Sequence, residues 1–174
     1  AANLSPAALR AAADDTSVSL LLLAMGIKLG VPGLHLWLPL AYRVAPTPAA
    51  VVLSGAMMKA GLLGLLLFLP WDRPGFAAHG QILIVVGLFA AFYGVAMGLI
   101  QRHAKTLLGY SSISQMGLLT TGLGALLSEP DAAPALLPAL IAFAVHHGLA
   151  KGGLFLVLAR QDGRWPWRSE EHTS

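Results

Sequence analysis

Residues 18–39 read VSLLLLAMGIKLGVPGLHLWLP, an apolar run that contains one lysine and one Gly-Val-Pro-Gly interruption. A helix needs about 20 mostly apolar residues to cross a bilayer, because each residue adds about 1.5 Å and the hydrocarbon core is about 30 Å thick. Similar runs recur downstream, and none has the alternation of a barrel strand. The sequence therefore predicts an all-α, polytopic transmembrane helix bundle with five spans, at residues 18–39, 48–69, 81–100, 106–127 and 134–158.

The composition supports a membrane chain. Hydrophobic residues make up 56% of the 174 residues, charged residues make up 11%, and the mean hydropathy is +0.71. A soluble domain carries roughly 25% charged residues, so a soluble globule, a disordered chain and a nucleic-acid-binding module are all excluded. The sequence has no cysteine, metal-ligand cluster, phosphate loop or nucleophile–base pair. We expect no covalent chemistry, no metal and no cofactor in this chain.

The distribution of lysine and arginine predicts the topology. Connections on one side carry Arg43, Arg102, Lys105, Arg160 and Arg164, whereas those on the other side mix basic with acidic residues. Cytoplasmic connections are enriched in lysine and arginine. The N-terminal end is therefore expected outside and the C-terminal end in the cytoplasm, in a multi-pass protein of a bacterial cytoplasmic membrane.

Both ends of the sequence indicate a fragment. The chain does not begin with methionine, and residues 168–174 read RSEEHTS, which resembles a translated sequencing adapter. We interpret residues 1–167 as an internal part of one membrane transporter domain and residues 168–174 as an adapter-derived tail without a structural role.

Three lysines lie inside apolar runs, namely Lys28, Lys59 and Lys151. At 1.5 Å per residue, Lys28 is about 16 Å from Ser17, Lys59 about 16 Å from Pro48 and Lys151 about 13 Å from Arg160. A lone ammonium at that depth costs several kcal/mol. One such lysine can reach the interface along its aliphatic stem, but three at a common depth favour a lateral row of protonatable sites. We therefore predict that all three ammonium groups face the bundle interior.

Other polar residues are candidates for the same pathway. His147 shares a helix face with Lys151 at i, i+4 and can relay protons near neutral pH; the alternative is a buried histidine bonded to a carbonyl. Gly30, Pro32 and Gly33 predict that the first span is discontinuous, because they free carbonyls beside Lys28; a simple proline kink is the alternative. Candidate water or channel contacts, for which helix packing is the alternative, are His35, Ser111, Ser112, Ser114 and Gln115.

Five segments together resemble a known family. They are Lys28 to Pro39, Ala45 to Pro48, Leu53 to Gly61, Lys105 to Gly117, and His147 to Leu156. In this order they are similar to the antiporter-like membrane subunits of respiratory complex I. The same family includes Mrp-type sodium/proton antiporter subunits and the membrane arms of energy-converting hydrogenases.

The resemblance implies a function and roles for the lysines. Lys28 is then the central lysine of the broken helix, Lys59 is the next relay residue, and Lys151 with His147 is the one after. The implied function is proton translocation within a redox-driven complex, with NADH–quinone oxidoreductase favoured. The alternatives are a sodium/proton antiporter subunit, a hydrogenase arm or an inert membrane scaffold. Other membrane subunits and protons, or sodium, are the implied partners; neither nucleic acid nor quinone binding is expected.

The sequence departs from the family pattern in its acidic residues. No aspartate or glutamate lies within a predicted span, although family members pair the broken-helix lysine with a glutamate from an earlier helix. We expect that glutamate upstream of Ala1 and the terminal relay residue downstream of this chain. Leu40 occupies a position where the family commonly has aspartate.

Overall fold

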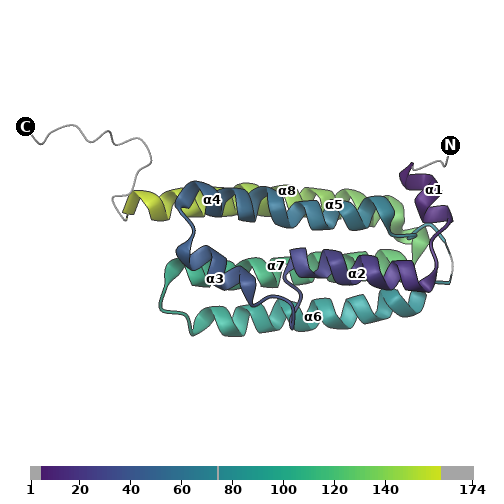
Figure 1. Ribbon diagram of the computed structural model, residues 1–174, viewed down its shortest axis with the longest axis horizontal. Coiled ribbons are helices and arrows are strands. Elements are labelled where there is room, and N and C mark those ends of the chain that lie inside the picture. The colour runs from purple at the N-terminus through teal and green to yellow at the C-terminus, as the bar shows by residue number, and fades with distance from the viewer. Residues whose placement is uncertain (1–4, 74, 162–174) are drawn as a thin grey trace, which may run out of the picture.

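The chain folds into an elongated helical bundle. The structure is a computed structural model that describes residues 5–73 and 75–161, and no strand occurs within them. Figure 1 shows α4, α5 and α8 along one long edge and α2, α3, α7 and α6 along the other. The elements are α1 (Pro6–Ala11), α2 (Asp15–Leu29), α3 (Trp37–Val44), α4 (Thr47–Val52), the π-helical turn η1 (Leu53–Met57), α5 (Met58–Phe68), α6 (Ala77–Leu99), α7 (Ala104–Ser128), the 3₁₀ turn η2 (Pro130–Ala132) and α8 (Ala133–Gln161).

Three of the described helical segments are long and apolar enough to cross a membrane, namely Thr47–Phe68, Ala77–Leu99 and Pro130–Arg160. They coincide with the second, third and fifth predicted spans. Helix α2, with 15 residues, is too short to qualify by length. Helix α7 has 25 residues but is not apolar enough. Fourteen of its residues are buried, so its polar side chains face other helices.

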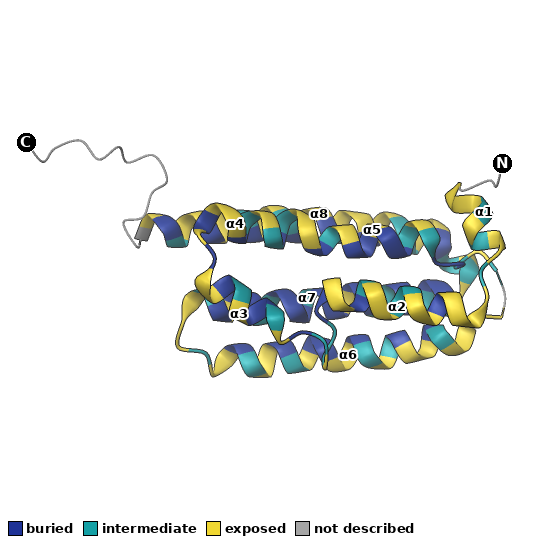
Figure 2. Cartoon of the chain, viewed as in Figure 1, coloured by how far each residue is buried: buried dark blue, intermediate teal, exposed yellow. Residues whose placement is uncertain are grey.

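Figure 2 shows the burial pattern that accompanies this arrangement, with exposed positions along the outer faces of α6 and α8. Large apolar side chains occupy many of them, including Val85 at 67% exposure, Phe92 at 75% and Leu149 at 74%. Apolar surfaces of this extent are unfavourable in water and favourable against lipid or further helices. The chain is therefore a multi-pass membrane protein.

The end of α2 follows from local backbone chemistry. Gly30 has φ 74°, a left-handed conformation that glycine adopts without strain. Its amide donates to the Ile27 carbonyl at 3.3 Å, and the Val31 amide donates to the Gly26 carbonyl at 3.1 Å, which together form a Schellman motif. The Trp37 indole also donates to the Ile27 carbonyl, at 2.9 Å, and so links the start of α3 to the end of α2.

Helices α6 and α7 touch backbone to backbone. Gly80, Gly87 and Gly94 recur every seven residues on α6 and face α7. A Cβ at Gly87 would lie only 2.6 Å from the Thr121 amide nitrogen and 2.7 Å from the Gly117 carbonyl oxygen. Small residues allow such close approach between membrane helices, where the gain comes from van der Waals packing. This contact fixes α7 against α6 and leaves the other faces of α7 for α3 and α8.

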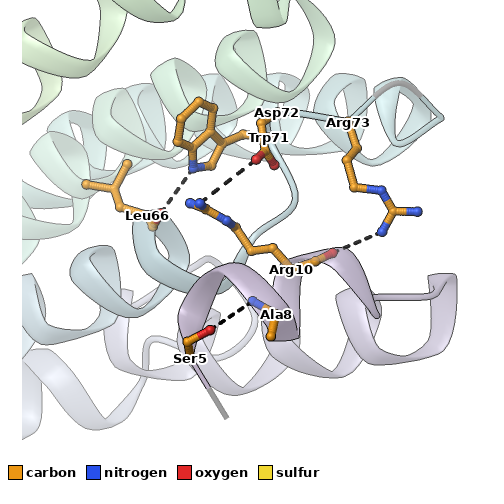
Figure 3. Close-up of polar contacts among 7 residues, drawn as sticks. All are labelled: Ser5, Ala8, Arg10, Leu66, Trp71, Asp72 and Arg73. Carbon is orange, nitrogen blue, oxygen red and sulfur yellow. Dashed lines mark hydrogen bonds and ion pairs between the residues drawn. The ribbon is translucent and has the colours of Figure 1, made fainter. Parts of the chain in front are cut away.

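Arg10 and Arg73 make polar contacts at the end of the bundle where α1 lies (Figure 3). Arg73 Nη1 donates to the carbonyls of Arg10 and Ala11, both at 2.9 Å, which are the last carbonyls of α1. The Arg10 guanidinium lies 5.2 Å from the centre of the Trp71 ring and 3.9 Å from an Asp72 carboxylate oxygen. The contact therefore attaches α1 to the connection between α5 and α6.

We expect Gly87→Ala to destabilise the bundle by about 1–3 kcal/mol, because the new methyl group meets backbone atoms that cannot move independently. Gly98→Ala is the matched control, since a Cβ there would lie 3.6 Å from the Tyr110 Cβ, an ordinary contact. Thermal unfolding in detergent micelles measures both. Equal midpoints for the two variants would contradict the close packing of α6 and α7.

We expect Arg73→Gln to destabilise the attachment of α1 to the bundle by about 1 kcal/mol. The last carbonyls of α1 would lose the charged donor that they share. The amides of α1 would then exchange hydrogen faster, while those of α6 would not. Arg102→Gln, at an exposed arginine on the opposite end, is the control. Unchanged exchange in α1 would show that Arg73 does not hold this helix.

Candidate functional site

Two of the three predicted lysines and the predicted histidine converge where α5 and α8 meet. Lys59 Nζ lies 2.8 Å from His147 Nδ1 and also donates to the Ser54 carbonyl. His147 and Lys151 are each only 3% exposed, and Lys59 is half-buried. An amine and an imidazole at hydrogen-bonding distance can share one proton, because each binds a proton reversibly.

Lys151 connects this pair to α7. Its Nζ donates to the Leu108 carbonyl at 3.0 Å, and the Ser112 hydroxyl donates to the same oxygen at 3.0 Å. His147 Nε2 is buried and has no hydrogen-bond partner among the described residues. The cluster of Lys59, His147 and Lys151 thus consists of bases only, held by backbone carbonyls on one side.

The π-helical turn η1 explains why a carbonyl is available to Lys59. The Met58 amide donates to the Leu53 carbonyl, five residues back, instead of to Ser54. The Ser54 carbonyl is therefore not used by Met58 and accepts from Lys59 Nζ. Single π-helical turns inside α-helices occur frequently at functional sites.

Tyr42 on α3 also belongs to this site, although sequence reasoning missed it. Its side chain is fully buried, its ring stacks on Phe155 at 5.1 Å between centroids, and its hydroxyl lies 3.6 Å from Met58 Sδ. The hydroxyls of Ser54 and Ser112 are its polar neighbours. The available signal was the i, i+4 spacing from Leu38, which places Tyr42 on the buried face of α3.

Lys28 is not part of the cluster, and its inward orientation stays a prediction. Its side chain is exposed on this chain. Its Cβ lies where α2 meets α5, since a Cβ at Gly61 would lie 3.1 Å from it.

The remaining candidates occupy three separate places. His35, 5% exposed, lies beside the junction of α2 and α3 with Gly30, Pro32 and Gly33. Ser112 faces Leu108 and Lys151, as described above. Ser111, Ser114 and Gln115 instead line a cavity of about 190 Å³ between α6 and α7, with Gly94 and Gly98 on its other wall.

An open groove gives access to the cluster from one side. It has a volume of about 590 Å³, lies between α5 and α8, and has Lys59 as its one charged lining residue. The described residues contain no group of three or more histidine, aspartate or glutamate side chains able to hold a metal ion. Lys59, His147 and Lys151 can each bind a proton reversibly.

Comparison with known proteins places this geometry in context. The family described as NADH:quinone oxidoreductase/Mrp antiporter, TM, matches residues 8–164. The chain is 38% identical over 141 residues to NAD(P)H-quinone oxidoreductase chain 4 of Prochlorococcus marinus strain MIT 9211, covering 79% of this chain and 24% of the relative. The protein of the same name from strain MIT 9312 is 37% identical, with 79% and 25% covered.

A second kind of relative carries no functional name. An uncharacterized protein of Mycobacterium tuberculosis strain H37Rv is 40% identical over 107 residues, covering 61% of this chain and 17% of the relative. This chain therefore spans a quarter or less of the length of the curated relatives it matches.

The different surroundings of the lysines predict different reactivity. We expect a membrane-permeant, amine-reactive reagent to label Lys28 fastest, Lys59 more slowly and Lys151 slowest, because their exposure decreases in that order. Peptide mass spectrometry after a time course measures the three rates. Labelling of Lys151 as fast as Lys28 would contradict the buried position of its amine.

Proposed function

Because this chain belongs to the NADH:quinone oxidoreductase/Mrp antiporter membrane family, we propose that it carries part of a proton-translocating pathway through the membrane. The observation that carries the proposal is the contact between Lys59 Nζ and His147 Nδ1 at 2.8 Å, with the buried Lys151 on the same face of α8. Ionisable residues buried at membrane depth commonly mark proton and ion pathways.

The pathway works by exchange of charge between neighbouring bases. A proton on Lys59 is donated toward His147 Nδ1, and His147 Nε2 is then the next site from which a proton can leave. Two like charges in one buried cluster disfavour each other, so a proton arriving at Lys151 promotes release from Lys59 or His147. The hydroxyls of Tyr42 and Ser112 lie beside Ser54 and Leu108. There they can help to position the ammonium groups of Lys59 and Lys151.

Lys28 acts in this proposal together with residues outside this chain. Its exposed amine is available to a polar group on a neighbouring helix, and the matched segments cover only 24% and 17% of these curated relatives. We further propose that α2 and α3 are the two halves of one discontinuous span, with the junction at Gly30, Pro32 and Gly33. Helix α2 alone, with 15 residues, is only about 22 Å long, which is less than the hydrocarbon core.

The topology in the membrane follows from charge. The end of the bundle that holds the last turns of α3 and α8 carries Arg43 and Arg160 (Figure 1). Arg102 lies between α6 and α7, and Lys105 lies in the first turn of α7. The opposite end is mixed in charge and includes Asp14, whose pKa is lowered by hydrogen bonds from Ser17. We place the basic end in the cytoplasm and the mixed end outside, in a bacterial cytoplasmic membrane with five crossings.

The names of the relatives support a redox-driven partner complex. Two of them are NAD(P)H-quinone oxidoreductase chain 4, so we propose that residues 1–167 act within one transporter domain beside other membrane subunits of such a complex. The exposed apolar faces of α6 and α8 are suited to those contacts. A sodium/proton antiporter subunit is the alternative, because the matched family description also includes the Mrp antiporters.

The test replaces relay lysines in the full-length parent reconstituted in vesicles. We expect Lys59→Met and Lys151→Met each to slow proton transport at least about tenfold, which corresponds to about 1.4 kcal/mol in the barrier. Assembly with partner subunits should persist, because methionine fills a similar volume without leaving a buried charge. A pH-sensitive dye inside the vesicles measures the rate, with and without sodium.

Lys105→Met is the matched control. Lys105 donates to the Ala45 carbonyl at 3.1 Å near the basic end of the bundle and lies outside the cluster. Its replacement is expected to leave transport within about twofold of the parent. Full transport in both Lys59→Met and Lys151→Met would favour a scaffold function and overturn the proposal.

A further inference from the structure

His35 occupies the junction between α2 and α3 with both ring nitrogens engaged. The Gly33 amide donates to Nδ1 at 3.2 Å, and Nε2 lies 3.0 Å from the hydroxyl oxygen of Tyr93 on α6. The ring is 5% exposed and meets the Tyr93 ring edge-on, with 5.0 Å between centroids. The relay cluster on α5 and α8 does not use this side chain.

The hydrogen bonds determine which form of the imidazole fits. Because the Gly33 amide is a donor, Nδ1 must carry a lone pair, so the neutral ring has its hydrogen on Nε2 and donates to Tyr93. A protonated ring carries hydrogen on both nitrogens. Its Nδ1–H would then face the Gly33 N–H, and one of the two groups would have to move.

The backbone at Gly33 has the freedom to move. Its φ is 93°, which a residue with a side chain rarely adopts, and no atom lies within 4 Å of the position a Cβ would take. The segment on either side is held only by short turns, with the Leu34 amide on the Val31 carbonyl and the Leu38 amide on the His35 carbonyl. A change at Gly33 therefore reaches the start of α3 directly.

Within the part of the chain that the structure describes, the groups that contact the His35 ring include no other base. The titratable groups recorded against its ring are Tyr93 on α6 and Tyr110 on α7, with the Tyr110 ring centroid 6.4 Å away. On α2 the charged Lys28 is exposed, and on α3 Arg43 is exposed in the last turn, at the opposite end from His35. No charged side chain of residues 5–73 and 75–161 is recorded in contact with the His35 ring.

We propose that His35 is a proton-binding site whose protonation releases the Gly33 amide and loosens the junction between α2 and α3. Protonation is thereby coupled to a change in backbone conformation next to Lys28. Its relevance to transport rests on the proposed function, but the conformational change is a property of this chain. When the His35 ring is neutral, its Nδ1 accepts the hydrogen bond from the Gly33 amide and the junction keeps the conformation described here. The Trp37 indole also connects α3 to α2 by its hydrogen bond to the Ile27 carbonyl.

Trp37 reports on the junction because its indole nitrogen donates across it at 2.9 Å. The experiment uses the full chain in lipid nanodiscs with Trp71, Trp165 and Trp167 replaced by phenylalanine, so that Trp37 alone fluoresces. We expect its emission to change in a single transition as the pH falls below about 6.5, because burial and the bond from Gly33 both favour the neutral ring. His35→Asn is expected to abolish that transition, because the asparagine carbonyl can still accept from Gly33 but does not titrate.

Two tyrosine variants separate the hydrogen bond from ring packing. Tyr93→Phe removes the partner of Nε2 and is expected to shift the midpoint of the transition. Tyr110→Phe keeps the second ring beside His35 and removes a hydroxyl that interacts with Tyr93 instead of with His35, so it should shift the midpoint less than Tyr93→Phe does. Circular dichroism at each pH checks that helix content is retained.

The possible results are decisive for this inference. A Trp37 transition that is absent in the parent, or that persists unchanged in His35→Asn, overturns it. Because emission is read without a proton gradient, either result leaves the transport proposal for Lys59 and Lys151 untouched. Conversely, loss of that transport proposal would leave a pH-dependent junction at His35 in place.

Discussion

Burying amines in a membrane protein is costly unless polar groups replace the water around them. Here the replacements are backbone carbonyls and one imidazole. Lys59 bonds to the Ser54 carbonyl and His147, and Lys151 bonds to the Leu108 carbonyl. In a regular helix such carbonyls accept from backbone amides of the same helix. The π-helical turn η1 makes the Ser54 carbonyl accessible to Lys59, and the position of α7 brings the Leu108 carbonyl next to Lys151. The packing of α5, α7 and α8 follows from this requirement.

Helix α7 is held in that position by α6. The glycines on the two helices let the backbones approach closely, and Leu108 and Ser112 lie on the side of α7 that faces α8. The same helix provides Ile113 next to Gly30 and Tyr110 next to His35, and thus also lines the junction of α2 and α3. One polar, largely buried helix connects the two titratable regions. This explains why α7 is less apolar than a helix surrounded by lipid needs to be.

The two regions differ in how a proton would act on them. In the cluster of Lys59, His147 and Lys151 it changes the balance of charge among neighbouring bases. At His35 it changes which backbone bond the imidazole can accept. Family membership accounts for a membrane domain, whereas the roles of individual residues depend on these local geometries.

Apolar run length and composition were enough to predict a helical membrane bundle, because they depend on local chemistry. The left-handed Gly30 ends α2, whereas the discontinuity of the first span stays a prediction. The spacing of His147 and Lys151 likewise predicted a shared face. Helix rotation and approach were not predictable in this way. The burial of Tyr42 and the π-helical turn before Lys59 arise from contacts between segments distant in the chain. Close packing selects among rotations that a periodic sequence leaves nearly equal in energy, so only the tertiary structure decides which polar groups meet.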